Sequence, residues 1–208
     1  MNNLIYSLEF IGILAFAISG FQAAKKHEMD PVGYFFIACV TAFGGGTARD
    51  LILDRTPVYW IQYQEFPILI LILAFVFAYI KPLSKFDVLD RTKILIPDAI
   101  GLAIFSVLGT KLALDEGMTP FIAIILGVMT GTVGGIMRDV MCNEIPYLFR
   151  KLQFYATSAF IGCALFIGLG YFVTEDIALW TAFVFIAIFR LLAMRYDWRL
   201  QKPLENID

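Results

Sequence analysis

The sequence predicts an all-α membrane protein with seven transmembrane helices, arranged as two inverted three-helix repeats followed by a seventh helix. Three observations support this fold class. The 208-residue chain is 60% hydrophobic and only 16% charged, which is unusual for a soluble domain. Its apolar residues fall into seven long runs. A glycine-rich segment that ends in Arg-Asp occurs twice, 89 positions apart.

The apolar runs have about the length that a membrane requires, because roughly 20 helical residues cross about 30 Å of hydrocarbon. The third run is the shortest, with 15 residues. Little chain is left outside the membrane, so we expect one transmembrane domain over residues 1–208 and no separate soluble catalytic domain. The predicted spans cover residues 4–24, 31–53, 66–80, 95–114, 120–142, 152–173 and 177–194.

The basic residues separate to one side of the membrane if the N-terminus lies outside and the seven spans alternate. Eleven of them then lie in cytoplasmic segments, and only Arg55 lies in an outer segment. Because cytoplasmic loops carry an excess of Lys and Arg, we expect an outside N-terminus and a cytoplasmic C-terminus. The eleven are Lys25, Lys26, Lys81, Lys85, Arg91, Lys93, Arg150, Lys151, Arg195, Arg199 and Lys202.

The two halves of the chain are related by an internal repeat. Residues 9–57 align with residues 98–146 without a gap, and the identities fall on glycines, prolines and charged residues. Repeat one covers about 4–82, repeat two about 95–173, and the seventh helix about 177–194. Because each repeat holds three spans, an odd number, the second repeat enters the membrane in the opposite orientation. Inverted repeats of this kind are typical of transport proteins.

Glycines interrupt the second span of each repeat near the middle of the membrane. They are Gly44, Gly45 and Gly46 in the first copy, and Gly134 and Gly135 in the second. Each glycine weakens a helix by up to about 1 kcal/mol. We therefore expect the second and fifth helices to be broken or kinked, beside a watery cavity or buried in protein. The alternative is that the glycines let two helices pack closely.

An Arg-Asp pair follows each group of glycines: Arg49 with Asp50, and Arg138 with Asp139. The helical rise of about 1.5 Å per residue places the two arginines roughly 10 Å from the midplane, on opposite sides. Charges at such depth are costly and usually face a cavity or a partner. Neighbouring residues point about 100° apart on a helix, so we expect partners on other helices rather than a full pair within each motif. Snorkelling to the headgroups is the alternative.

Other polar residues within the spans are weaker candidates for a transport path. Ser19, Thr41 and Thr130 offer hydroxyl groups either to a hydrated path or to their own helix backbone. Lys111, near the outer end of the fourth span, either snorkels or lines a pore.

Four further residues have simpler interpretations. Glu9 and Asp98 correspond between the repeats, and Asp98 follows a proline where an acid would suit a helix start. Arg190, near the inner end of the seventh span, is interpreted as a snorkelling anchor. His27, in a basic loop, is interpreted as solvated.

No enzyme motif is present in the sequence, whether a phosphate loop, a nucleophile elbow or a cluster of metal ligands. The three cysteines fall within spans and are interpreted as small apolar side chains. We therefore expect no enzyme activity, no cofactor, no bound metal and no nucleic-acid partner, and we expect contact with membrane lipid.

The segments from Gly44 to Asp50 and from Gly134 to Asp139 resemble those of the prokaryotic TRIC (trimeric intracellular cation) channels, also catalogued under a "glycine transporter" domain name. The resemblance covers nearly the whole chain. It implies a homotrimer with a pore in each protomer, lined by the first, second, fourth and fifth spans and permeated by potassium and sodium. The glycines would form kinks, the Arg-Asp pairs a charged network, and Lys111 part of the outer lining. Val133 stands where the first copy has Gly44, so the two kinks need not be equally flexible.

The sequence thus favours a monovalent cation channel of the bacterial inner (plasma) membrane, gated where the glycines precede the Arg-Asp pairs. Arginines along a pore oppose cations unless they are neutralised, which Asp50 and Asp139 can do. The alternative is a secondary carrier for a small zwitterion such as glycine, bound by the Arg-Asp pairs. A non-transporting membrane scaffold would leave the buried charges without a role.

Overall fold

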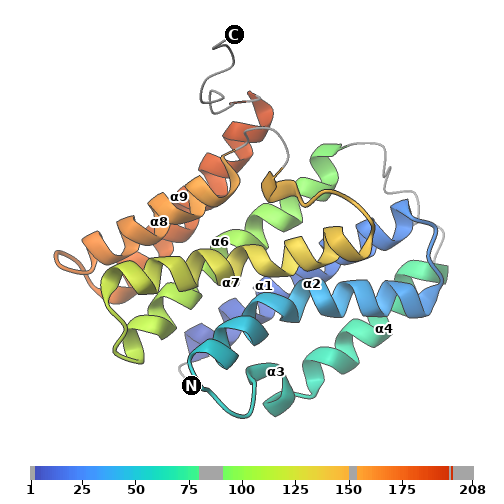
Figure 1. The fold of residues 1–208 in the computed structure, drawn as a ribbon, viewed down its shortest axis with the longest axis horizontal. Coiled ribbons are helices and arrows are strands. Elements are labelled where there is room, and N and C mark those ends of the chain that lie inside the picture. Colours follow the sequence, from blue (N-terminus) through green and yellow to red (C-terminus); the bar gives the residue numbers. More distant parts are fainter. Residues whose placement is uncertain (1–2, 80–90, 150–153, 197, 199–208) are drawn as a thin grey trace, which may run out of the picture.

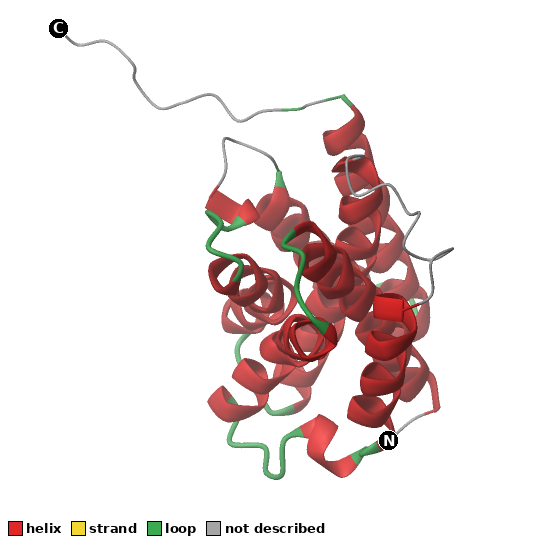
Figure 2. Cartoon of the chain, turned by 90° about the vertical axis from the view of Figure 1, so that its right-hand side faces the viewer, coloured by secondary structure: helices red, strands yellow, loops and turns green. Residues whose placement is uncertain are grey.

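The computed structural model describes residues 3–79, 91–149, 154–196 and 198, and every regular element in these ranges is a helix (Figure 2). In chain order the elements are α1 (Asn3–Lys26), α2 (Pro31–Ile52), α3 (Tyr59–Gln62), α4 (Glu65–Tyr79), α6 (Arg91–Asp115), α7 (Pro120–Met141), η1 (Tyr147–Phe149), α8 (Tyr155–Leu169) and α9 (Glu175–Arg195).

Seven of these helices match the predicted spans. Five of them, α1, α2, α6, α7 and α9, are long and apolar enough to cross a membrane. The other two, α4 and α8, are apolar and have 15 residues each in the described part. The predicted all-α fold is therefore confirmed. The following predicted features lie outside the described residues: the ends of the third span and of repeat one, the start of the sixth span, and the basic residues Lys81, Lys85, Arg150, Lys151, Arg199 and Lys202.

The first helix of each repeat lies at the centre of the bundle. Of the five long helices, α1 and α6 have the largest buried share. The second helices, α2 and α7, pack side by side and run in opposite directions across the middle of the molecule (Figure 1). α4 packs against α1 and α2, whereas α8 and α9 pack against each other and against α6. The two repeats are therefore interleaved rather than placed side by side as separate units.

Contacts between corresponding residues show the two-fold relation of the repeats. Phe16 of α1 stacks on Phe105 of α6, its counterpart 89 residues later, with ring centroids 5.3 Å apart and an angle of 6° between the planes. The glycines beside these two rings make the same contact in both directions. A Cβ atom on Gly12 would meet the Phe105 ring, and one on Gly101 would meet the Phe16 ring. A residue that touches its own counterpart lies at the two-fold axis, so this axis passes between α1 and α6.

The ends of α2 and α7 are also built alike. Each helix begins with a proline, which costs little there because the first backbone N–H groups of a helix have no partner within it. Each helix is followed by a residue in the left-handed region, Asp54 with φ 53° and Asn143 with φ 54°. In both cases the backbone N–H of the following residue donates to the backbone carbonyl of the aspartate in the motif. Arg55 donates to Asp50 and Glu144 donates to Asp139, both at 2.8 Å. Both ends thus have a left-handed capping residue.

Neither helix is interrupted at its glycines, so of the two expected forms the break is absent and the kink stays a prediction. The α-helix continues through Gly44–Gly46 in α2 and through Gly134–Gly135 in α7. The glycines instead allow close packing. A Cβ atom on Gly45 would overlap the carbonyl oxygen of Thr130, and one on Gly134 would overlap that of Thr41. The two backbones are therefore nearly in contact, which offsets the low helix propensity of glycine.

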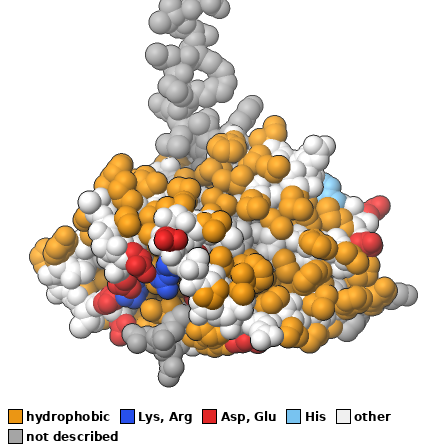
Figure 3. Space-filling view, turned by 60° about the horizontal axis from the view of Figure 1, so that its bottom comes forward, with side chains coloured by type: hydrophobic (Ala, Val, Ile, Leu, Met, Phe, Trp, Pro, Cys, Tyr) orange, Lys and Arg blue, Asp and Glu red, His pale blue; other side chains and the backbone are white. Residues whose placement is uncertain are grey.

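The surface of the bundle is mostly apolar, as expected for a protein in lipid. Figure 3 shows hydrophobic side chains over most of one face, with basic and acidic side chains gathered at the left and the histidine at the right beside further acidic side chains. Seven charged side chains are nevertheless buried among the described residues: Glu9, Arg49, Asp50, Asp98, Arg138, Asp139 and Arg190. Because burying a charge in a membrane protein is costly, these residues define the candidate site.

Candidate functional site

The first group of buried charges, here the Arg49 cluster, consists of Arg49, Asp50, Glu9 and Tyr59. The Arg49 Nε and Nη2 atoms each lie 2.8 Å from Asp50 Oδ1. Arg49 Nη2 lies 4.0 Å from Glu9 Oε1, so α1 supplies a second, more distant carboxylate. Arg49 is 2% exposed and stays within the protein rather than reaching the headgroups.

Tyr59, in the short helix α3 that follows α2, covers this cluster. Its backbone N–H donates to Asp50 Oδ2 at 3.0 Å, and its ring centroid lies 5.3 Å from Arg49 Cζ. The ring also lies beside Gly46, where a Cβ atom would collide with it. Gly46 is therefore needed for the ring to reach the arginine.

The second group, here the Arg138 cluster, consists of Arg138, Asp139, Asp98 and Ser19. Arg138 Nη1 donates to Asp98 Oδ1 at 2.8 Å and to the Ser19 hydroxyl at 2.5 Å. Its Nε and Nη2 atoms lie 2.9 and 2.8 Å from Asp139 Oδ1. The other Asp139 oxygen accepts the N–H of Tyr147 at 2.7 Å. Three helices, α1, α6 and α7, thus meet at one guanidinium group.

The charged residues of the two clusters correspond at the offset of 89, whereas Tyr59 and Ser19 have no like counterpart, since Leu148 matches Tyr59. Glu9, Arg49 and Asp50 match Asp98, Arg138 and Asp139, but the position that matches Ser19 holds Leu108. A leucine cannot accept a hydrogen bond. Within the described part of the chain, Arg49 Nη1 and Glu9 Oε2 accordingly have no hydrogen-bond partner. Arg49 is therefore held by fewer bonds than Arg138.

Of two predictions about these charges, one needs correction and the other agrees with the structure. Arg49 and Asp50 pair fully with each other, as do Arg138 and Asp139, because the long arginine side chain places two of its nitrogens beside one carboxylate oxygen. The expected partners on other helices are also present, at Asp98 and Ser19 for Arg138 and, more distantly, at Glu9 for Arg49.

Asp98 was expected to cap a helix, and this prediction is wrong. α6 begins at Arg91 and passes through Pro97 without ending, so Asp98 lies inside the helix. Its carboxylate is buried and binds Arg138. The correspondence of Asp98 with Glu9 in the repeat is the sequence signal that indicated a shared role.

The hydroxyl groups proposed for a hydrated path divide into two kinds. Thr41 and Thr130 are buried, and each donates to the backbone of its own helix, to Ile37 O and to Leu126 O, both at 2.6 Å. For these two threonines the backbone alternative is the one observed. Ser19 belongs to the Arg138 cluster.

Lys111 lies apart from both clusters, near the end of α6. Its ammonium group pairs with Asp115 at 3.1 Å and with Glu175 at the start of α9. The three side chains line a surface pocket of about 340 Å³ together with residues of α8. Lys111 thus lines this surface pocket rather than lying beside Arg49 or Arg138.

Two loop residues form matching ion pairs at opposite ends of the molecule. At one end, Glu144 binds Lys26 at 2.5 Å and His27 Nε2 at 2.9 Å, so His27 is not simply solvated as predicted. At the other end Arg55, the counterpart of Glu144, lies 3.5 Å from Glu116, the counterpart of His27. The repeat therefore conserves the geometry of these contacts and exchanges the signs of the charges.

Arg190 was expected to snorkel from α9, and it does not. It is fully buried, with its Cζ atom 4.6 Å from the Tyr155 ring centroid and 5.3 Å from that of Tyr147. A guanidinium group stacks favourably on aromatic faces, which explains why it remains in the interior. Sequence alone gave no signal for this contact, because α9 lies outside the repeat.

Sequence comparison relates the whole chain to a known family. The family model described as "Glycine transporter" matches residues 6–82 and 95–171, once on each repeat. The UPF0126 inner membrane protein YadS of Escherichia coli K12 is 37% identical over 99% of this chain and 98% of its own length. The UPF0126 membrane protein YvgT of Bacillus subtilis is 35% identical over 97% of each chain.

Structure comparison points to the same family. The TRIC trimeric intracellular cation channel orthologue from Rhodobacter sphaeroides matches with a TM-score of 0.86 and 33% identity, over 94% of this chain and all of that one. A prokaryotic TRIC channel solved in 0.5 M KCl matches with a TM-score of 0.86 and 30% identity, over 96% of this chain and all of that one. With likeness in sequence and in fold over nearly its whole length, this protein belongs to the prokaryotic TRIC channel family, whose family model is described as "Glycine transporter".

Proposed function

We propose that this protein is a channel for monovalent cations, potassium and sodium, in the bacterial inner (plasma) membrane. The observation that carries the proposal is one buried Arg-Asp cluster in each half of an inverted repeat, in a chain that matches TRIC cation channels over nearly its whole length. The membrane assignment is supported by five long apolar helices and by the inner membrane protein of Escherichia coli.

The ion path in this proposal runs between α1, α2, α6 and α7 of one protomer. These helices carry the charged residues of both clusters and contact one another. The proposed lining consists of Gly44, Gly45, Gly46, Arg49, Asp50, Gly134, Gly135, Arg138 and Asp139, with Ser19, Thr41, Thr130 and Lys111 as further lining residues. The arginines do not exclude cations along this path, because each has two carboxyl groups within 4.0 Å.

Gating in this proposal takes place at the two arginines. Arg49 and Arg138 are 2% and 5% exposed, which supports a closed state in which each side chain fills its part of the path. Because α2 and α7 are continuous, opening is proposed to come from sliding or separation of these two helices at their glycine contact. Such a movement carries each arginine away from the carboxylate on α1 or α6, Glu9 or Asp98.

Assembly and orientation follow the same reasoning. A homotrimer with one path per protomer is proposed because the Rhodobacter sphaeroides relative is described as a trimeric channel. The N-terminus is placed outside and the C-terminus in the cytoplasm, because eleven basic residues then face the cytoplasm. Membrane lipid surrounds the trimer, and no cofactor or nucleic acid is required.

The test is a planar bilayer that contains the purified protein, with a potassium chloride gradient across it. Discrete unitary currents that reverse near the potassium potential are expected. The family description "Glycine transporter" makes a carrier for glycine the contrasting outcome. A silent bilayer, together with saturable uptake of labelled glycine into liposomes made from the same preparation, would replace the channel by the carrier.

A further inference from the structure

Arg190 is a fully buried cation that the proposed gates do not use. It lies in α9, which is not part of either repeat, so the first half of the chain has no residue that corresponds to it. Its guanidinium group faces the rings of Tyr155 and Tyr147 at 4.6 and 5.3 Å. Cation–π contacts of this kind stabilise a desolvated arginine by less than the cost of burying an unpaired charge.

No nitrogen of Arg190 has a hydrogen-bond partner within the described ranges of the chain. A buried guanidinium group has five N–H donors, and leaving them without acceptors is costly. The positive charge therefore needs compensation from negative charges nearby.

The two tyrosines whose rings face Arg190 also contact the Arg138 cluster. Tyr147 donates its backbone N–H to Asp139 Oδ2 at 2.7 Å, and the hydroxyl of Tyr155 interacts with the Asp98 carboxylate. The same hydroxyl lies 3.2 Å from where a Cβ atom on Gly135 would stand. Arg190 is thus linked to the two acids of the cluster through two tyrosines, by the backbone N–H of Tyr147 and by the hydroxyl of Tyr155.

The two clusters therefore differ in composition. The Arg138 cluster has two carboxyl groups, on Asp98 and Asp139, and with Arg190 it has two guanidinium groups. The Arg49 cluster has two carboxyl groups, on Glu9 and Asp50, and one guanidinium group. In a medium of low dielectric constant, one extra charge dominates the local potential.

We propose that Arg190 neutralises the Arg138 cluster. The parts of the proposed ion path at the two clusters, here the Arg49 narrowing and the Arg138 narrowing, then differ in charge. The inference rests on the proposed channel function. The Arg49 narrowing keeps one excess carboxyl group and concentrates cations, whereas the Arg138 narrowing does not. In symmetrical potassium chloride, current that enters from the Arg49 side is therefore larger than current that enters from the Arg138 side. Arg190 is in this sense a residue that sets conductance and rectification.

The first experiment compares unitary current–voltage curves of the wild type, Arg190→Gln and Arg195→Gln in symmetrical potassium chloride. Arg195 is the matched control, because it lies on the same helix and is exposed. The wild type and the Arg195 variant are expected to rectify alike. Arg190→Gln is expected to lose the rectification and to raise the unitary conductance by about twofold or more, since the Arg138 narrowing then keeps a negative charge. Arg190→Lys retains the charge and is expected to retain rectification.

A second variant keeps the inference testable if Arg190→Gln does not fold. Glu9→Gln removes the excess carboxyl group of the Arg49 cluster with little change of shape, and it is expected to abolish rectification while lowering the potassium conductance. Wild-type rectification in a conducting Arg190→Gln or Glu9→Gln channel would overturn the inference and leave the channel function intact. Absence of any unitary current in the wild type would instead overturn the proposed function, and the inference with it.

Discussion

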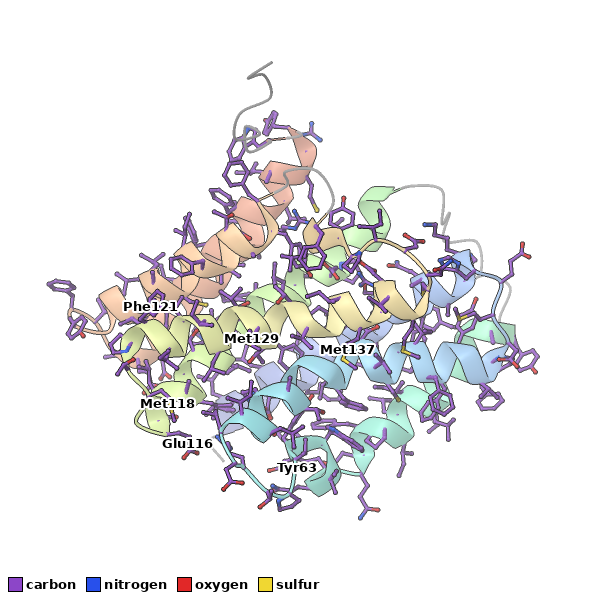
Figure 4. The ribbon with its side chains drawn as sticks, viewed as in Figure 1. Tyr63, Glu116, Met118, Phe121, Met129 and Met137 are labelled. Carbon is purple, nitrogen blue, oxygen red and sulfur yellow. The ribbon has the colours of Figure 1, made fainter. Side chains whose placement is uncertain are left out.

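Gly45 of α2 packs directly on the backbone of Thr130 of α7, so closely that a Cβ atom on Gly45 would overlap the Thr130 carbonyl oxygen. The counterpart contact, Gly134 on Thr41, repeats this arrangement across the two-fold axis. The sulfur of Met137 fills the adjoining space 2.9 Å from where a Cβ atom on Gly44 would stand, and Figure 4 shows this side chain between α7 and α2. At this double contact the two backbones leave no room for a side chain, and the Arg-Asp pairs follow it on both helices.

Substitution of Gly45 or Gly134 by alanine tests this contact. The added methyl group has no space, because the neighbouring atoms belong to backbone, and we expect a loss of stability of about 1–3 kcal/mol. Thermal unfolding in detergent measures the effect. Gly168→Ala in α8 is the control, because a Cβ atom there would meet no atom within 4 Å. Equal unfolding temperatures for all three variants would contradict the packing role of the α2–α7 glycines.

Ser19→Ala tests whether the hydroxyl group holds Arg138 in place. Its removal deletes one charge-assisted hydrogen bond, which contributes about 1.5–3 kcal/mol, and leaves the bonds to Asp98 and Asp139. We expect lower stability and a higher open probability in bilayer recordings. Ser158→Ala is the matched control, since that buried hydroxyl donates to the backbone of its own helix, at Tyr155 O. An open probability unchanged by Ser19→Ala would argue against gating by Arg138.

The orientation of the chain can be tested with two equivalent loop positions. Asp54 and Asn143 correspond in the repeat, are both exposed and have nearly identical φ angles of 53° and 54°. The inverted topology places them on opposite sides of the membrane. In a cysteine-free background, Asp54→Cys is expected to react with an impermeant thiol reagent in intact cells, and Asn143→Cys only after the cells are opened. The reverse pattern would invert the proposed topology.

The sequence carried most of the fold because its signals were long or duplicated. Seven apolar runs gave the helices, and the repeat gave the inverted arrangement that the Phe16–Phe105 contact shows. The glycine contact was one of two open alternatives, since glycine both weakens a helix and permits close approach. Only the neighbouring helix, which the sequence does not reveal, decides between these effects.

The details of the buried charges could not be predicted from local patterns. The angle of 100° between neighbouring positions describes where Cβ atoms point, but the Arg49 side chain is long enough to return to Asp50. Asp98 follows a proline, which indicated a helix start, yet α6 tolerates Pro97 in its interior. Arg190 depends on two tyrosines from other segments of the chain. Each of these outcomes is set by tertiary contacts, which a single sequence does not encode as a pattern.

The most direct test of the central claim is single-channel recording of the wild type beside Arg49→Ala and Arg138→Ala, each shown first to insert and to elute as a single species. The account predicts discrete potassium currents from the wild type and a higher open probability in both variants, because each removes a side chain that closes the path. Arg195→Ala, at an exposed position, should behave as the wild type. Wild-type currents from both arginine variants would contradict gating at the clusters.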